Sequence, residues 1–180
     1  WKYYMSERYF LIGTDESYEP LPLMIDVRKS IKEEYLEEGE SYKQAGISLV
    51  NIRGSFDENT KYPDIMDRGI FMLSDEAYEI FKLYELATII KRVLLMGENS
   101  NEAYEYIIPI LKKIDCLSNK TTFRRGRYID KGILIGKNIP DIALFKIPSV
   151  DGMCTVARLD FVESLLKRGM KGIYLQTLEI

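Results

Sequence analysis

The clearest pattern of apolar and polar positions along the chain begins at residue 70. Residues 70–73 are all apolar and predict a short strand, and Ser74 follows with two acidic residues behind it. A serine hydroxyl can accept a hydrogen bond from the first turn of a helix, where the helix dipole also favours acids. Apolar residues then recur at the spacing of a helical face, at Ala77, Phe81 and Tyr84. The pattern predicts a strand, a serine cap and a helix in direct succession.

A long antiparallel hairpin is predicted over residues 88–114. Its first arm is rich in β-branched residues, which favour strands, and residues 97–101 are dense in turn formers. In its second arm, apolar side chains recur at every second position from residue 104 to residue 110, which is the period of a strand. Pro109 cannot donate a ladder hydrogen bond, so it predicts an edge position or a bulge in this second arm.

The last third of the chain predicts short strands around one amphipathic helix. Phe161, Val162 and Leu165 fall at helical spacing, so we expect a helix over residues 159–168. Gly169 follows where a helix needs a C-terminal cap, and the basic residues before it suit the negative end of the helix dipole. The strands expected around this helix cover residues 128–135, 141–147, 153–157 and 172–178.

The first third of the chain gives a weaker pattern. Val27, Ile31 and Tyr35 are spaced by four residues, which predicts a narrow helical stripe within residues 25–42. The other expected elements are a strand over residues 1–12, a loop over 14–22, a strand over 47–53 and an exposed connector over 57–67. Together with the later elements they predict an α+β fold, a twisted, mostly antiparallel sheet flanked by a few helices. We expect a single domain over residues 1–180, with residues 1–60 as a candidate subdomain.

Composition mainly argues against certain classes of protein and partner. The chain has 180 residues, 46% of them hydrophobic and 29% charged, with a net charge of -3, so nucleic acid and anionic membranes are disfavoured as principal partners. No apolar stretch approaches the roughly 20 residues that span a bilayer. Cys116 and Cys154 form no disulfide framework and are expected to be buried thiols, so the cytoplasm is the expected compartment. Glu7 and Arg8 make the first ten residues a poor signal peptide.

The chain contains no histidine. Histidine is the usual general base near neutral pH, activates serine and cysteine nucleophiles, and binds catalytic metals. Its absence argues against Ser-His-Asp and Cys-His hydrolases, zinc hydrolases and histidine phosphotransfer, while catalysis by carboxylates, lysine or tyrosine stays open. The glycine spacing also fits no phosphate-binding loop. We therefore assign no catalytic residue, no metal ligand and no cofactor.

Several segments of the last third succeed one another in a distinctive order. They are residues 114–118 (IDCLS), 142–147 (IALFKI), 154–156 (CTV), 161–166 (FVESLL) and 169–175 (GMKGIYL). Together with residues 68–80 (RGIFMLSDEAYEI), this order resembles an immunity-protein family of bacterial polymorphic-toxin systems, a myxobacterial-type domain of unknown function. The likeness covers residues 62–178 and departs from the family pattern at Lys146, Ala157 and Arg158. The resemblance implies a non-enzymatic protein that binds and neutralises a cognate toxin.

Two segments of opposite charge are candidates for contact with such a toxin. Residues 15–40 carry nine acids and three bases, and this acidic segment could mimic nucleic acid in the cleft of a nuclease toxin or simply form a solvated helix face. Residues 112–137 carry eight bases and two acids, and this basic segment could contact phosphates and bases or pair with the chain's own acids, which we favour. The candidate contact residues are Glu33, Glu34, Glu37, Glu38, Arg124, Arg125 and Arg127.

Two other functions stay open. A carboxylate-dependent enzyme such as a glycoside hydrolase needs only Asp and Glu, and a pocket with two carboxylates of oppositely shifted pKa would favour it. A regulatory adaptor that binds no toxin is the other. A broad polar surface would favour a binding protein, and exposed tyrosines near Tyr35, Tyr42 and Tyr62 would be further contact candidates. The sequence determines neither the identity of the toxin nor the oligomeric state.

Overall fold

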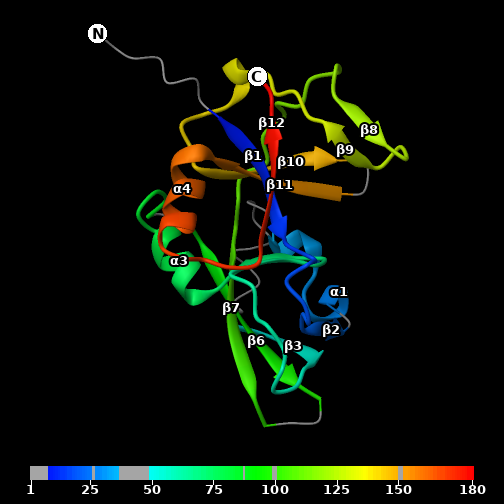
Figure 1. The fold of residues 1–180 in the computed structure, drawn as a ribbon, viewed down its shortest axis with the longest axis vertical. Coiled ribbons are helices and arrows are strands. Elements are labelled where there is room, and N and C mark those ends of the chain that lie inside the picture. Colours follow the sequence, from blue (N-terminus) through cyan, green and yellow to red (C-terminus); the bar gives the residue numbers. More distant parts are fainter. Residues whose placement is uncertain (1–7, 26, 37–48, 87, 99–100, 150–151) are drawn as a thin grey trace.

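The computed structural model describes residues 8–25, 27–36, 49–86, 88–98, 101–149 and 152–180. Their strands form a four-stranded sheet, a six-stranded sheet and a two-stranded hairpin, with helices packed beside them (Figure 1). The predicted α+β fold with a mostly antiparallel arrangement of strands is confirmed. No helix in these ranges combines the length and the apolar character needed to cross a membrane.

The four-stranded sheet joins the N-terminal strand to the C-terminal third of the chain. Its strands are all antiparallel and lie in the order β10 (Leu144–Ser149), β11 (Gly152–Arg158), β1 (Tyr9–Thr14) and β12 (Ile173–Leu178). β1 therefore lies between two strands that follow it by more than 130 positions. The register pairs Tyr9 with Leu178 on one side and with Arg158 on the other.

Both faces of this sheet are covered. One face packs against α3 (Asp75–Phe81) and α4 (Leu159–Lys167), and its core contains Ile12, Leu144, Ala157, Phe81 and Phe161. The other face packs against the segment that precedes β10, and its core contains Tyr9, Phe145, Val156, Cys116, Ile129 and Leu134. Alternate residues of a strand point to opposite faces, which is why neighbours such as Phe145 and Leu144 belong to different cores. In Figure 1 the two helices and the β8–β9 hairpin lie on opposite sides of β1.

The six-stranded sheet holds the predicted hairpin. Its order is β2 (Leu23–Ile25), β3 (Leu49–Ser55), β6 (Ile90–Gly97), β7 (Ala103–Pro109), β5 (Phe71–Leu73) and β4 (Ile65–Asp67). β6 and β7 pair antiparallel as predicted, while β3 and β6 are parallel. The prediction of an edge or a bulge at Pro109 was wrong, because β7 lies inside the sheet. Pro109 is tolerated there as the last residue of the strand, opposite Ile90.

The strand, cap and helix predicted from residue 70 onwards are confirmed. Ser74 precedes α3, and its Oγ accepts a hydrogen bond of 3.1 Å from the Ala77 N–H. The same hydroxyl donates to Asp64 Oδ1 at 2.6 Å, which ties the helix start to the chain before β4. At the end of α4, Gly169 adopts the left-handed conformation (φ 75°) that its predicted capping role requires.

Several expectations for the less regular segments are corrected. The helical stripe forms two short pieces, α1 (Val27–Ser30) and the 3-10 turn η1 (Glu33–Leu36), and residues 37–42 lie outside the described ranges. Its apolar side chains nevertheless pack on the core of the six-stranded sheet, with Ile31 only 6% exposed and Val27 and Tyr35 partly buried. The prediction of an exposed connector over residues 57–67 was wrong at its C-terminal end, because Ile65 and Met66 of β4 are fully buried. The strand over 128–135 is shorter, since β9 (Tyr128–Lys131) ends early and pairs with an unpredicted strand, β8 (Thr122–Arg124).

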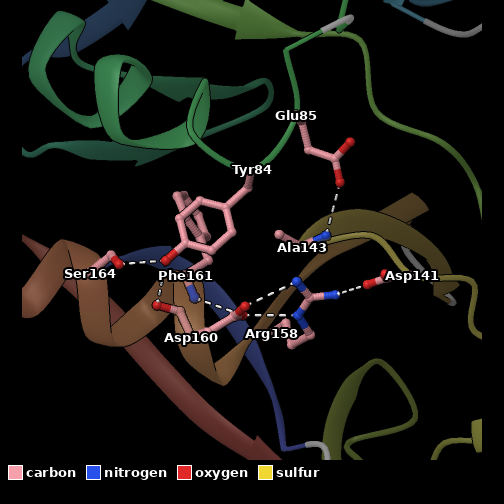
Figure 2. Close-up of polar contacts among 8 residues, drawn as sticks. All are labelled: Tyr84, Glu85, Asp141, Ala143, Arg158, Asp160, Phe161 and Ser164. Atoms are coloured by element: carbon pink, nitrogen blue, oxygen red, sulfur yellow. Dashed lines mark hydrogen bonds and ion pairs between the residues drawn. The ribbon is translucent and has the colours of Figure 1, made fainter.

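A polar cluster fixes α4 to its surroundings, as Figure 2 shows. Arg158 takes the N-cap position of α4 without capping it, and its guanidinium instead binds both carboxylate oxygens of Asp160 at 2.9 and 3.0 Å. Nη1 of the same guanidinium donates to Asp141 Oδ1 at 2.5 Å, and Asp141 lies just before β10 in the sequence. Hydrogen bonds from Arg158 lower the pKa of Asp160, and the two carboxylates raise that of Arg158. Arg158 therefore belongs to an internal ion-pair cluster with Asp141 and Asp160.

Candidate functional site

A large hollow in the described part of the chain opens where β11 separates from β1. β1 pairs with β12 as far as Thr14, but with β11 only as far as Leu11, although β11 continues to Gly152. The space between the diverging strands forms a cleft of about 710 Å³, which we call the β1–β11 cleft. Its walls come from β1 and the turn after it, the end of β4, β11, β12 and the β8–β9 hairpin. Segments far apart in the sequence thus share one concave surface.

Asp67 projects into this cleft from the end of β4. Its backbone N–H donates to Thr14 Oγ1 at 2.6 Å, and its Oδ2 would lie 3.6 Å from a Cβ built on Gly13. The side chain keeps an exposed surface while protein surrounds it closely, the combination expected of a carboxylate that solvent reaches through a cleft. Burial raises the pKa of Asp67 from its usual value near 3.8 to about 6, and the charge of Lys146 acts in the opposite direction. Asp67 is therefore an accessible acid that titrates close to neutral pH.

The turn after β1 supplies the acidic rim of the cleft. The Asp15 carboxylate accepts hydrogen bonds from the Ser17 N–H at 2.9 Å and from the Ser17 hydroxyl at 2.6 Å, and these bonds lower the pKa of Asp15. Glu16 forms an ion pair of 3.0 Å with Arg68. The Asp15 N–H donates to the Gly172 carbonyl, which holds the turn against the start of β12. Both rim acids are thus already engaged within the chain.

The β8–β9 hairpin supplies the basic and aromatic wall. Arg124 and Arg127 line the cleft, and Arg124 forms an ion pair of 2.9 Å with Asp130 of the same hairpin. Gln176 of β12 donates two hydrogen bonds, of 3.0 and 2.9 Å, to the carbonyls of Ile129 and Asp130. These bonds fix the hairpin above the sheet although its own side chains are almost all exposed.

The structure separates the predicted contact residues into two groups. Arg124, Arg125 and Arg127 share the exposed hairpin, with Arg125 in its turn at φ 53° and outside the cleft lining. Glu34 is exposed in η1 and pairs with Lys32 at 3.8 Å, and Glu33 belongs to the same turn. Glu37 and Glu38 lie outside the described residues. None of the described acids of this group lines the cleft.

Of the tyrosines considered as contact candidates if exposed, the two that the structure describes are partly buried. Tyr62 stacks on Tyr104 with ring centroids 4.0 Å apart, and Tyr35 is half-buried against the core of the six-stranded sheet. Tyr42 lies outside the described residues. The exposed rings belong instead to Tyr128 and Tyr174, which are 65% and 48% exposed and both line the cleft.

The cysteines behave differently from each other. Cys116 is fully buried as predicted, and burial raises the pKa of its thiol to about 11, which makes it a poor nucleophile. Cys154 is only half-buried and lines the cleft. Within the described ranges, no three Cys, Asp or Glu side chains are grouped closely enough to hold a metal ion.

Asp67 is the cleft residue that sequence reasoning missed. Sequence reasoning placed Asp67 at the end of an exposed connector and so gave it no role. The apolar pair Ile65 and Met66 just before it was a usable sign of a strand. Comparison with known proteins adds no assignment, because neither a protein-family model nor a curated protein matches this chain.

Proposed function

We propose that this chain is an immunity protein that binds a cognate bacterial toxin one to one and neutralises it without catalysing a reaction. The observation that carries the proposal is the exposed β8–β9 hairpin beside the β1–β11 cleft. It presents arginine and aromatic side chains next to a concave surface, and these residue types dominate the energetically important positions of protein interfaces. Tyr128 and Tyr174 are exposed enough for a partner to bury both rings.

The resemblance of residues 62–178 to an immunity-protein family supports the same function. The segments that carry it fall mostly in β5, α3, β10, β11, α4 and β12, and two of these elements, β11 and β12, line the cleft. Neither Cys116 nor Cys154 forms a disulfide bond in the structure, which suits a reducing compartment. We place the encounter with the toxin in the cytoplasm of the cell that makes both proteins.

A rescue experiment tests the proposal. Bacteria that express the C-terminal toxin domain encoded beside this gene should stop growing, and co-expression of this chain should restore colony formation. The matched partner should also form a one-to-one complex in gel filtration. If the chain neither protects cells nor binds the adjacent domain, the proposed function is wrong.

A pair of charge reversals locates the interface. Arg124→Glu combined with Arg127→Glu reverses the basic wall. If both arginines are among the few residues that dominate the binding energy, each worth about 1.4 kcal/mol or tenfold, toxin affinity should fall about 100-fold. Lys120→Glu combined with Lys137→Glu makes the same charge change in the same basic segment but outside the cleft lining. Affinity and protection should survive in this control. Equal losses in both proteins would show that net charge, and not the hairpin, determines binding.

A carboxylate-dependent enzyme is the second candidate, because the cleft contains two acids with opposite pKa shifts. Asp67 has a raised pKa and Asp15 a lowered one, as in sites where one acid donates a proton while another stays ionised. The Asp15 carboxylate is, however, occupied by the Ser17 hydrogen bonds. Hydrolysis of aryl glycosides by the wild-type protein, lost in Asp67→Asn, would favour the enzyme over the binding protein.

A further inference from the structure

The Asp67 carboxylate differs from the other charged groups of the cleft in having no close partner. Among the described residues, no hydrogen bond or ion pair engages its two oxygens, and the charge of Lys146 acts on it only from a longer distance. The remaining acids of the cleft are bonded to Ser17 and Arg68. A carboxylate that is accessible from a cleft and has no partner within the chain can accept hydrogen bonds from a donor outside the chain.

The surroundings of Asp67 favour a flat cation as that donor. A guanidinium group offers two parallel N–H donors to one carboxylate, and its plane stacks on aromatic rings. The exposed rings of Tyr128 and Tyr174 line the same cleft. The cleft volume of about 710 Å³ leaves ample space for the end of an arginine side chain.

We propose that the β1–β11 cleft is a receptor for an arginine side chain of the partner protein, whose guanidinium binds the Asp67 carboxylate beside Tyr128 and Tyr174. The inference rests on the proposed function, because it names the group of the toxin that enters the site. Arg124 and Arg127 line the same cleft, and their charge would attract acidic side chains of the partner. The acidic rim, Asp15 and Glu16, stays bonded within the chain and adds a favourable field at the mouth.

The proposed pair between the partner's arginine and Asp67 makes the binding affinity depend on pH. A bound cation stabilises the ionised form of Asp67, so binding lowers its pKa below the value of about 6 in the free protein. By linkage, affinity is full at about pH 7 and above, and it falls as the carboxylate becomes protonated on going through pH 6 to lower pH. The charged groups that face the carboxylate are Lys146 of β10, Asp15 and Glu16 of the rim, and Arg124 and Arg127 of the hairpin.

A ligand titration tests this receptor without the toxin. The full chain with ¹³C-labelled aspartate is titrated with Nα-acetyl-arginine amide at pH 7.5, and the carboxyl resonance of Asp67 and the ring resonances of Tyr128 and Tyr174 are followed. Nα-acetyl-citrulline amide has the same shape without the charge and serves as the matched ligand. We expect the arginine probe to shift these resonances and the citrulline probe to leave them unchanged.

Variants complete the test. Asp67→Asn should weaken binding of the arginine probe about tenfold or more, which is typical of the loss of a charged hydrogen bond. Glu163→Gln removes one negative charge from α4, on the other side of the sheet, and should bind like the wild type. Equal binding of the two probes, no response to either, or unchanged affinity in Asp67→Asn would overturn the proposal. If the chain rescues cells but does not bind the arginine probe, the proposal of an arginine receptor is wrong, while the proposed immunity function is still supported.

Discussion

Replacing Asp67 with asparagine should make the protein more stable at neutral pH. Burial raises the pKa of Asp67 from about 3.8 to about 6, so its ionisation is easier in the unfolded chain than in the folded one. The full difference between these two values corresponds to about 3 kcal/mol. Solvent reaches the carboxylate through the cleft, and screening reduces the cost to about 1 kcal/mol. Asparagine has nearly the same shape without the charge, and it should recover this amount.

The sign of the effect follows from the direction of the shift. An acid with a raised pKa in the folded state costs nothing below its unfolded pKa near 4, weakens folding progressively between pH 4 and 6, and has its full cost above pH 6. The gain of Asp67→Asn is therefore complete at pH 7.5 and smaller at pH 4.5. Lys146 and the charged groups lining the cleft are present in both proteins, so the difference between them isolates Asp67.

Urea unfolding at pH 7.5 and pH 4.5 measures this gain. With a slope of about 2 kcal/mol per molar urea, 1 kcal/mol raises the midpoint by about 0.5 M. Glu163→Gln, which loses the same charge on the surface of α4, should change the free energy of unfolding by less than about 0.5 kcal/mol. The reasoning is refuted if Asp67→Asn is no more stable than the wild type at pH 7.5, or if its gain is the same at both pH values.

Three further changes test the framework that positions the cleft, each by urea unfolding. Phe161→Ala empties a fully buried site beside Phe81 and should cost about 3 to 5 kcal/mol; a loss below 1 kcal/mol would mean that the helices do not pack on the sheet as described. Gly172 has a φ of 68°, and Gly172→Ala would place a Cβ 2.4 Å from that of Pro63, so the variant should unfold at a lower urea concentration than the wild type. An unchanged urea midpoint would contradict the described geometry of this turn. Ser74→Ala removes the cap of α3 and should cost about 1 to 2 kcal/mol, whereas Ser74→Thr should retain most of the stability.

The sequence determined those parts of the fold whose signals are local. Ser74 with acids behind it, the apolar spacing of residues 161–166 and the glycine at 169 each act within one or two turns of the chain, and the structure places the corresponding helices within a residue or two of the prediction. The hairpin of β6 and β7 was predictable for the same reason, since its turn and its alternating second arm are contiguous. The close spacing of Arg124, Arg125 and Arg127 in the sequence is also local, and the structure places all three on one exposed hairpin, while their contact with a partner stays a prediction.

Only the tertiary structure decided where the site lies. The cleft exists because β11 leaves β1 after Leu11, and because β4 brings Asp67 to Thr14 across 53 positions of sequence. The partial desolvation of Asp67, and the lack of a partner that distinguishes it from the other charged groups of the cleft, are properties of this three-dimensional neighbourhood. A single sequence displays residue types and local periods, whereas desolvation and pairing depend on which distant segments meet.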